Sequence, residues 1–272
     1  MKSLNKNEIR EIQLEILKKT TDFCENNNLN YFLCGGTLLG AVRHQGYIPW
    51  DDDIDLMMPR PDYEKLKKIF SIKGFSLIDY NTKDQNYNLP FIKIQKDGTV
   101  LREQAANKLY MGIYIDIFPI DGFPDDEMKL EKHLKILNKL INKIIYKNLN
   151  YSKQGHPIWW KSLISKISYF IKRFSTNFYS NRKVSKKINK IACKYSFGTE
   201  NRSGIAVWGY GIKEVCPTGV FTETTEVLFE NRKYKSPKDF KTYLTCIYGD
   251  YLKLPPEKER IPRHNIKAFI KD

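Results

Sequence analysis

Residues 31–58 read YFLCGGTLLGAVRHQGYIPWDDDIDLMM, and this stretch decides the fold. A short apolar run ends on two glycines, an apolar stretch long enough for about two helical turns follows, and a second apolar run comes after a loop. The pattern predicts a strand, a glycine turn, a helix, a loop and another strand. The first strand is 31–34, the turn is Gly35 and Gly36, the helix opens at Thr37 and is broken at Gly46 and Pro49, and the second strand is 53–58.

Two carboxylates alternate with apolar residues on the second of these strands. Asp53 and Asp55 flank Ile54, so in a strand both project to the same face, roughly 7 Å apart. Left alone they repel each other, and a divalent cation relieves that repulsion. A surface loop is the alternative. A calcium loop is disfavoured, because Leu56 stands where such a loop requires glycine.

The glycines upstream predict a phosphate cradle. Without a Cβ, Gly35 and Gly36 let backbone N–H groups approach an anion, and the helix opened by Thr37 points its positive end the same way. Two adjacent glycines alone usually mark only a turn. Here a strand, the two glycines, a helix and a strand that carries Asp-x-Asp follow one another in the chain. This combination predicts a phosphoryl-transfer site.

The stretch GGTLLGAVRHQGYIPWDDDIDLMMPRPDYEKL, residues 35–66, resembles the signature of the LicD family, bacterial phosphocholine transferases related to fukutin-like proteins. The C-terminal sequence YGDYLKLPPEKERIPRH, residues 248–264, is similar to that family's ending. The resemblance implies a nucleotidyltransferase-like fold, a mixed sheet of the α/β (α+β) class with flanking helices. It also implies transfer of phosphocholine from CDP-choline to a sugar hydroxyl on a teichoic-acid or lipopolysaccharide precursor.

The same resemblance assigns expected roles. Asp53 and Asp55 would hold Mg²⁺, with Mn²⁺ as an alternative, and Gly35, Gly36 and Thr37 would cradle phosphate. Arg43 would bind phosphate through two hydrogen bonds. Arg260, Arg263 and His264 are candidate phosphate contacts or, equally, part of a surface tail. The alternatives are transfer of a nucleotide or another CDP-linked phospho-alcohol, and a non-catalytic binding protein.

A further carboxylate lies on the strand expected at 110–118. Ile113, Ile115 and Ile117 share one face of this strand, and Asp116 points to the other. An unpaired carboxylate on so apolar a strand is costly. A salt bridge is one interpretation. The other, implied by the resemblance, makes Asp116 the third metal ligand and the group that takes the acceptor's proton. Asp121, after Pro119, is expected in a turn as a solvated or capping residue.

The formal net charge of +15 is concentrated in one segment. Residues 132–198 contain sixteen Lys and Arg and no Asp or Glu, whereas the rest of the chain has 30 basic and 31 acidic residues. A basic groove through the active site, and hence nucleic-acid binding, is therefore not expected. Five cysteines without a C-x-x-C pair, no apolar leader and no long apolar run predict a cytoplasmic protein with reduced thiols.

The basic segment is expected to be helical and to interrupt the catalytic domain. We expect one domain from residues 1–125 and 199–272, with 126–198 inserted. The insertion's three apolar stripes either pack on the core or contact an anionic membrane surface, which a lipid-linked acceptor would require. The membrane interpretation rests on Trp159, Trp160, Leu163, Ile167, Phe170, Ile171 and Phe174 beside Lys161, Lys166, Lys172 and Arg173.

Elsewhere the sequence predicts shorter elements. They are an amphipathic helix at 5–25, a helix from Pro61, a strand at 75–79, a hairpin across Lys96-Asp97-Gly98, strands at 205–208 and 227–230, and a helix from Pro237 to Gly249.

Overall fold

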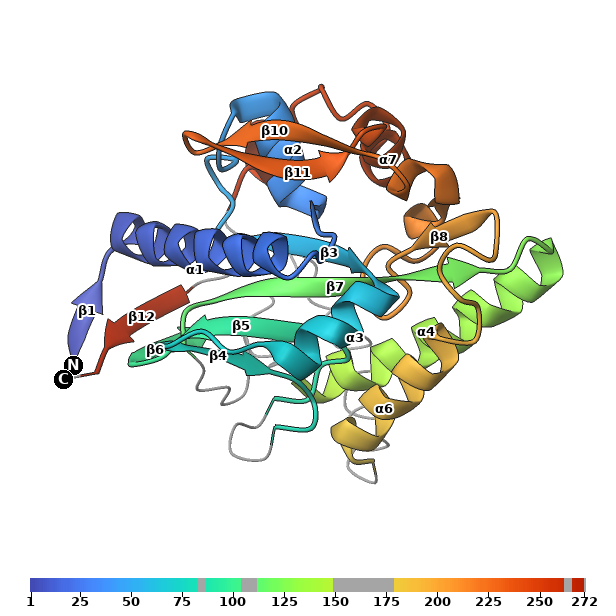
Figure 1. The fold of residues 1–272 in the computed structure, drawn as a ribbon, viewed down its shortest axis with the longest axis horizontal. Helices are drawn as coiled ribbons and strands as arrows, with labels where there is room; N and C mark the ends of the chain where they lie inside the picture. Colours follow the sequence, from blue (N-terminus) through green and yellow to red (C-terminus); the bar gives the residue numbers. More distant parts are fainter. Residues whose placement is uncertain (83–86, 104–111, 149–178, 262–265, 272) are drawn as a thin grey trace, which may run out of the picture.

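A computed structural model describes residues 1–82, 87–103, 112–148, 179–261 and 266–271. It has mixed α/β architecture, as predicted, with a seven-stranded sheet in which strand β7 is the central member (Figure 1). The strands are β2 (Phe32–Leu33), β3 (Asp55–Pro59), β4 (Phe75–Ile78), β5 (Ile92–Lys96), β7 (Tyr114–Phe123), β8 (Arg202–Gly204) and β9 (Cys216–Pro217).

Strand β7 organises the sheet because it is long enough to pair with three partners. Its first half runs parallel to β3 and antiparallel to β5, and its last residues pair with β8. The predicted strand at 110–118 is thus shifted, and it continues through Pro119 to Phe123. Apolar side chains on both faces of β7 are buried, as expected for a central strand covered on both sides.

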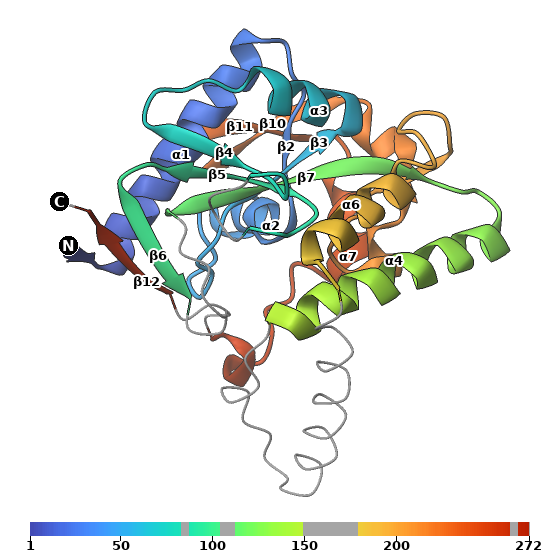
Figure 2. The same ribbon diagram turned by 90° about the horizontal axis from the view of Figure 1, so that it is seen from below.

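Helices cover both faces of this sheet. Helices α1 (Lys6–Asn26) and α3 (Arg60–Ile69) lie on one side of β7, and α2 (Gly35–His44) lies on the other (Figure 2). The first of these begins with a capping box, in which the Asn5 side chain accepts from the Glu8 N–H and Glu8 accepts from the Asn5 N–H. Helix α7 (Phe240–Tyr248) and a hairpin of β10 (Thr224–Phe229) and β11 (Arg232–Pro237) pack beside α2.

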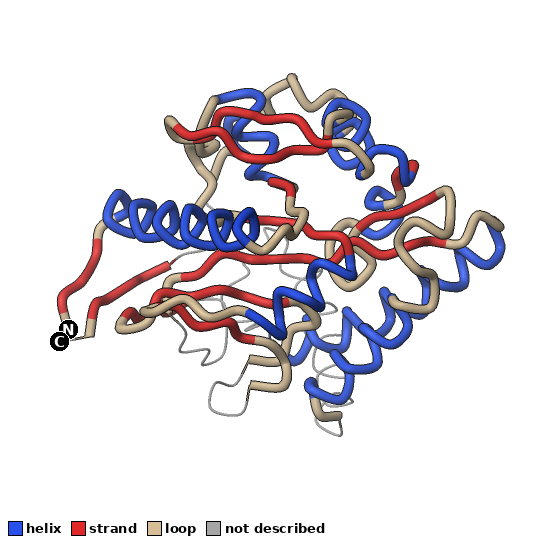
Figure 3. The backbone as a smooth tube through the Cα atoms, in the orientation of Figure 1, coloured by secondary structure: helices blue, strands red, loops and turns tan. Residues whose placement is uncertain are grey.

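The hairpin expected across Lys96-Asp97-Gly98 is wrong in its pairing. Gly98 does make the turn with a positive φ of 75°, but β6 (Thr99–Glu103) leaves β5 and pairs with β12 (Ile266–Ile270). Strand β12 also pairs with β1 (Lys2–Leu4), so the two ends of the chain lie side by side (Figure 3). The strand expected at 205–208 is also absent there, because pairing ends at Gly204.

Two helices of the basic segment pack against the sheet. Helix α4 (Glu127–Asn148) buries Leu130, Leu134 and Leu137, and α6 (Asn181–Ala192) buries Val184 and Ile188. All five belong to the same hydrophobic core as the sheet strands. Core packing is therefore confirmed for the first and third expected stripes. The second, with Trp159, Trp160 and Phe170, lies outside the described residues.

Asp121 corrects an expectation. It is only 1% exposed on β7, and both of its oxygens accept from Arg60, at 2.7 Å from Nε and 2.6 Å from Nη2. The same guanidinium donates to Asn189 Oδ1 at 3.0 Å. A buried charge needs such a partner. Asp121 therefore joins β7 to α3 and α6 instead of capping a turn.

In the described parts of the chain, every helix is too short or too polar to cross a membrane. All five cysteines are free thiols.

Candidate active site

Three charged side chains form a row across the middle of the sheet. The parallel pairing of β3 with β7 places Asp55 opposite Asp116, and the antiparallel pairing of β7 with β5 places Asp116 opposite Lys93. Neighbouring strands are about 4.8 Å apart, so paired residues share one face. Lys93 is 4% exposed and forms an ion pair with Asp116 Oδ1. The salt-bridge interpretation of Asp116 is thus correct, and its place beside Asp55 also keeps it a candidate ligand.

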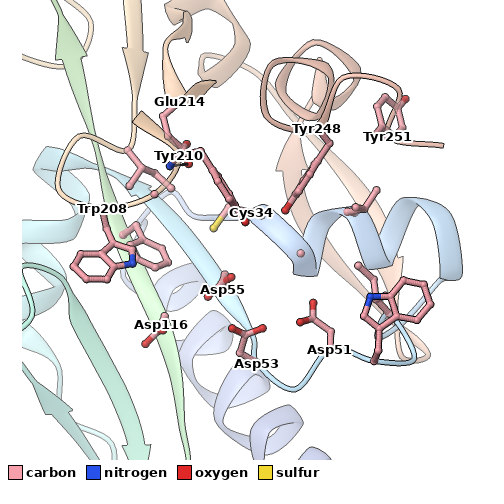
Figure 4. Close-up of a pocket in the computed structure, with 18 of the residues that line it drawn as sticks. Cys34, Asp51, Asp53, Asp55, Asp116, Trp208, Tyr210, Glu214, Tyr248 and Tyr251 are labelled. Atoms are coloured by element: carbon pink, nitrogen blue, oxygen red, sulfur yellow. Dashed lines mark hydrogen bonds between the residues drawn. The ribbon is translucent and has the colours of Figure 1, made fainter. Parts of the chain in front are cut away.

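These residues line a cavity of about 990 Å³. Asp51, Asp53, Asp55 and Asp116 lie along one side of it (Figure 4). One carboxylate oxygen from each of Asp51, Asp52 and Asp53 lies within 4.8 Å of the others. Asp51 and Asp52 are not among the ligands expected from the sequence, and the structure adds Asp51 to the cavity wall. Asp53 comes just before β3, which begins at Asp55.

The electrostatics of this wall favour a cation. Burial, and then the neighbouring charges of Asp53 and Asp116, raise the pKa of Asp55 well above its ordinary value, and Lys93 offsets only part of this. Four carboxylates that converge on one cavity are an oxygen-rich donor set. Such a set fits a hard divalent ion such as Mg²⁺. Mg²⁺ was expected from the sequence, and the residues present fit it.

The phosphate cradle stays a prediction: Gly35 and Gly36 line the cavity, and Gly35 and Thr37 also make hydrogen bonds within the protein. Helix α2 begins at Gly35, two residues earlier than expected, and the Gly35 N–H donates to Tyr243 Oη at 3.3 Å. The Thr37 hydroxyl accepts from the Asp55 N–H at 2.8 Å and so fixes the start of β3. At Gly36 an added Cβ would lie 2.5 Å from Asp51 Oδ2, so glycine is needed for this carboxylate to approach the helix.

The predicted arginines differ in their placement. Arg43 lines the cavity, and its Nη1 donates to the carbonyl oxygens of Tyr251, at 3.0 Å, and Lys253, at 3.5 Å. Arg260 is held farther out, where Nε donates to Pro255 O at 2.9 Å and the guanidinium lies 5.7 Å from the Trp50 ring centroid. Arg263 and His264 lie outside the described residues.

Sequence reasoning missed several residues of the cavity. Lys93 is one, because only the strand register shows that it faces Asp116. The others come from the C-terminal third of the chain: Trp208 lies beside Asp116, whereas Tyr210, Glu214 and Tyr248 lie across from the carboxylates (Figure 4). The sequence did offer one signal for Glu214: it is an acidic residue between the apolar and aromatic segment 205–210 and the next strand, β9.

Comparison with known proteins agrees with this geometry. The domain family described as LicD/FKTN/FKRP, nucleotidyltransferase domain, matches residues 28–141, which include Asp51, Asp53, Asp55 and Asp116. A lipopolysaccharide cholinephosphotransferase LicD from Haemophilus influenzae is 30% identical over 99% of this chain and 100% of its own length. The chain belongs to the LicD family. It is an enzyme, a phosphotransferase of the LicD type.

Other relatives share shorter regions. An uncharacterized protein from Rickettsia prowazekii, RP689, is 33% identical over 42% of this chain and 42% of its own length. The ribitol 5-phosphate transferase FKRP of Homo sapiens is 38% identical over 20% of this chain and 11% of its own length. Similarity to FKRP is therefore partial, whereas similarity to the Haemophilus LicD protein spans the chain.

Proposed function

We propose that this LicD-family enzyme transfers phosphocholine from CDP-choline to a sugar hydroxyl of a cell-surface glycan precursor, a lipopolysaccharide or a teichoic acid. The observation that carries the proposal is full-length similarity to a protein named as a lipopolysaccharide cholinephosphotransferase. The cavity supports it, because clustered carboxylates commonly bind the metal ions that bridge phosphates.

Asp53 and Asp55 would hold Mg²⁺, or Mn²⁺ in its place, with Asp51 and Asp116 at the same wall. When bound, the ion neutralises charge that develops on the phosphates and orients them for in-line displacement. The fit rests on the burial of Asp55 and on the neighbouring carboxylates, which together raise its pKa. Arg43 lines the cavity and would bind phosphate, and its two carbonyl contacts hold its guanidinium in place.

The transfer itself needs a proton acceptor beside the incoming hydroxyl. The acceptor oxygen forms a bond to the phosphorus that carries choline, the bond from that phosphorus to the bridging oxygen breaks, and CMP leaves with the electron pair. Asp116 would take the hydroxyl proton. Its ion pair with Lys93 orients the carboxylate before the reaction.

A lipid-linked acceptor would bring this enzyme to a membrane surface, and we include peripheral contact with anionic lipid, from the cytoplasm, in the proposal. Lysines of α4 and α6 are the described part of the basic segment that would meet the headgroups. Co-sedimentation with anionic vesicles at low salt tests this contact. Protein that stays in the supernatant would contradict it, and we expect added salt to release bound protein.

Partial similarity to a ribitol 5-phosphate transferase favours a second candidate, transfer of another CDP-linked phospho-alcohol. Native mass spectrometry of the full chain with Mg²⁺ and an equimolar mixture of CDP-choline, CDP-ribitol and CTP separates the candidates. We expect the CDP-choline complex. Retention of CDP-ribitol would favour the second candidate, and retention of CTP alone would favour nucleotidyl transfer.

A further inference from the structure

The cavity wall opposite the carboxylates carries a buried acid that the metal site does not use. Glu214 ends a short 3₁₀ turn, Gly211–Glu214, and is 2% exposed. Its Oε1 accepts from the Tyr210 N–H at 3.3 Å, whereas its Oε2 has no hydrogen-bond partner among the described residues. A buried carboxylate oxygen without a partner is costly, so its position at a cavity points to a ligand.

The backbone is shaped to place this acid. Gly209 has a φ of 98°, a left-handed conformation that favours glycine, and an added Cβ would lie 2.5 Å from Glu214 Oε1. Burial raises the pKa of Glu214 to about 8, and only the Tyr210 N–H acts in the opposite direction. A cation that entered the cavity would stabilise the ionised carboxylate of Glu214, for which the described residues supply no positive partner.

Two tyrosines complete a surface suited to a particular kind of cation. Tyr210 and Tyr248 meet edge to face, with ring centroids 6.1 Å apart and planes at 65°. Tyr210 is 44% exposed, which leaves much of its ring open to the cavity that it lines. Aromatic faces attract cations, and quaternary ammonium groups above all, since these have no N–H to donate to hydrogen-bond acceptors.

This surface is next to the proposed phosphate site. The position of a Cβ at Gly35 would lie 3.3 Å from Asp55 Oδ2 and 3.9 Å from Tyr248 Oη. The Tyr248 hydroxyl and the Asp55 carboxylate are therefore both close to Gly35, and Tyr210, Glu214 and Tyr248 lie across the cavity from the carboxylates (Figure 4). In phosphocholine two carbons join the phosphate to the trimethylammonium group, so the two groups need adjacent sites.

We propose that Glu214, Tyr210 and Tyr248 form a subsite for the quaternary ammonium group of the donor. The inference rests on the proposed function and assigns the residues that would select choline. Glu214 would balance the charge of the headgroup without a direct hydrogen bond, and the two rings would contact its methyl groups.

The test compares CDP-choline with its neutral isostere, CDP-3,3-dimethylbutanol, in which carbon replaces the charged nitrogen. Calorimetric titration of the full chain with Mg²⁺ gives a Kd for each compound. We expect wild type to prefer CDP-choline by about tenfold, and Glu214→Gln to lose most of that preference while the two rings keep the remainder. Binding of CMP should not change. The matched control is Glu223→Gln, which removes an exposed charge that is not part of the cavity lining and should keep the preference.

Each outcome decides the proposal. If wild type prefers CDP-choline and Glu214→Gln keeps that preference, the subsite is wrong, although phosphocholine transfer still stands. If wild type shows no preference, the subsite is also wrong, and turnover with CDP-choline then decides the proposed function separately.

If Glu214→Gln does not fold, Tyr210→Leu replaces it, because the Tyr210 ring is 44% exposed and its removal leaves no large gap in the core. Loss of the preference in that variant supports the subsite, and its retention overturns it.

Discussion

Asp55 is the residue at which the charges of the site converge. It is buried beside Asp53 and Asp116, which raise the pKa of its carboxyl, and Lys93 compensates only in part. In metal-free protein at neutral pH, Asp55→Asn should therefore raise the free energy of unfolding, by about 1 kcal/mol or about 3 °C in Tm. Thermal melts with EDTA measure this. Glu11→Gln, on an exposed face of α1, is the control, and a lower Tm for Asp55→Asn would contradict the repulsion.

Asp116 combines a structural and a chemical role that a double-mutant cycle separates. Asp116→Asn leaves Lys93 buried without its carboxylate, which should cost about 3 kcal/mol in stability as well as most of the turnover. In the double variant Lys93→Met with Asp116→Asn, the unpaired charge is gone. We expect stability to recover largely while turnover stays low. Turnover that recovers with stability would show that Asp116 is only an ion-pair partner.

Predictability from sequence differed among the site residues for physical reasons. Asp53 and Asp55 were predicted because the family signature covers them, and Asp116 because strand alternation, which is local, sets it apart from the isoleucines beside it. Lys93 was missed because its face becomes meaningful only once β5 pairs with β7. Glu214 was missed because its placement depends on the folded loop. In that loop Gly209 leaves room for the Glu214 carboxylate, and the sequence does not show that the two are close. Asp121 was placed wrongly, since Arg60 lies 61 residues away in sequence.

Among the elements, the Arg60 guanidinium joins β7, α3 and α6, because it contacts both Asp121 and Asn189. Asp121→Asn should lower the free energy of unfolding by about 3 kcal/mol, because the buried guanidinium keeps its charge and loses its carboxylate. Glu64→Gln is a matched control on the same guanidinium: its carboxylate is 43% exposed and 3.3 Å from Nη1, so we expect under about 1 kcal/mol. Denaturant unfolding measures both, and equal losses would refute the distinction.

Elements with a strong local pattern were predicted close to their observed bounds. Helices α1 and α3 and strand β4 are examples, because apolar periodicity and a proline at the second helical position act within a few residues. The pairing of β6 with β12 could not be predicted in this way. It joins residues more than 160 positions apart, and a turn sequence such as Lys96-Asp97-Gly98 specifies a reversal without specifying the partner strand.

At the scale of the whole molecule, the cavity is assembled from two distant parts of the chain. The carboxylates come from residues 51–116, and the aromatic and acidic wall comes from residues 208–254. In the described part of the basic segment, the lysines of α4 and α6 are not among the residues that line the cavity. The expected division into 1–125 with 199–272 and an inserted 126–198 stays a prediction, although α4 and α6 share the core of the sheet.

The most direct test of phosphocholine transfer at this carboxylate cluster is the mass of the acceptor after reaction. The full chain would be incubated with CDP-choline, a lipopolysaccharide or teichoic-acid precursor and Mg²⁺, in parallel with Asp55→Asn. We predict one added phosphocholine group, one CMP released per transfer, and turnover on the order of 10³-fold lower in the variant. An acceptor that gains a nucleotide or nothing, or an Asp55→Asn variant with normal turnover, would contradict the account.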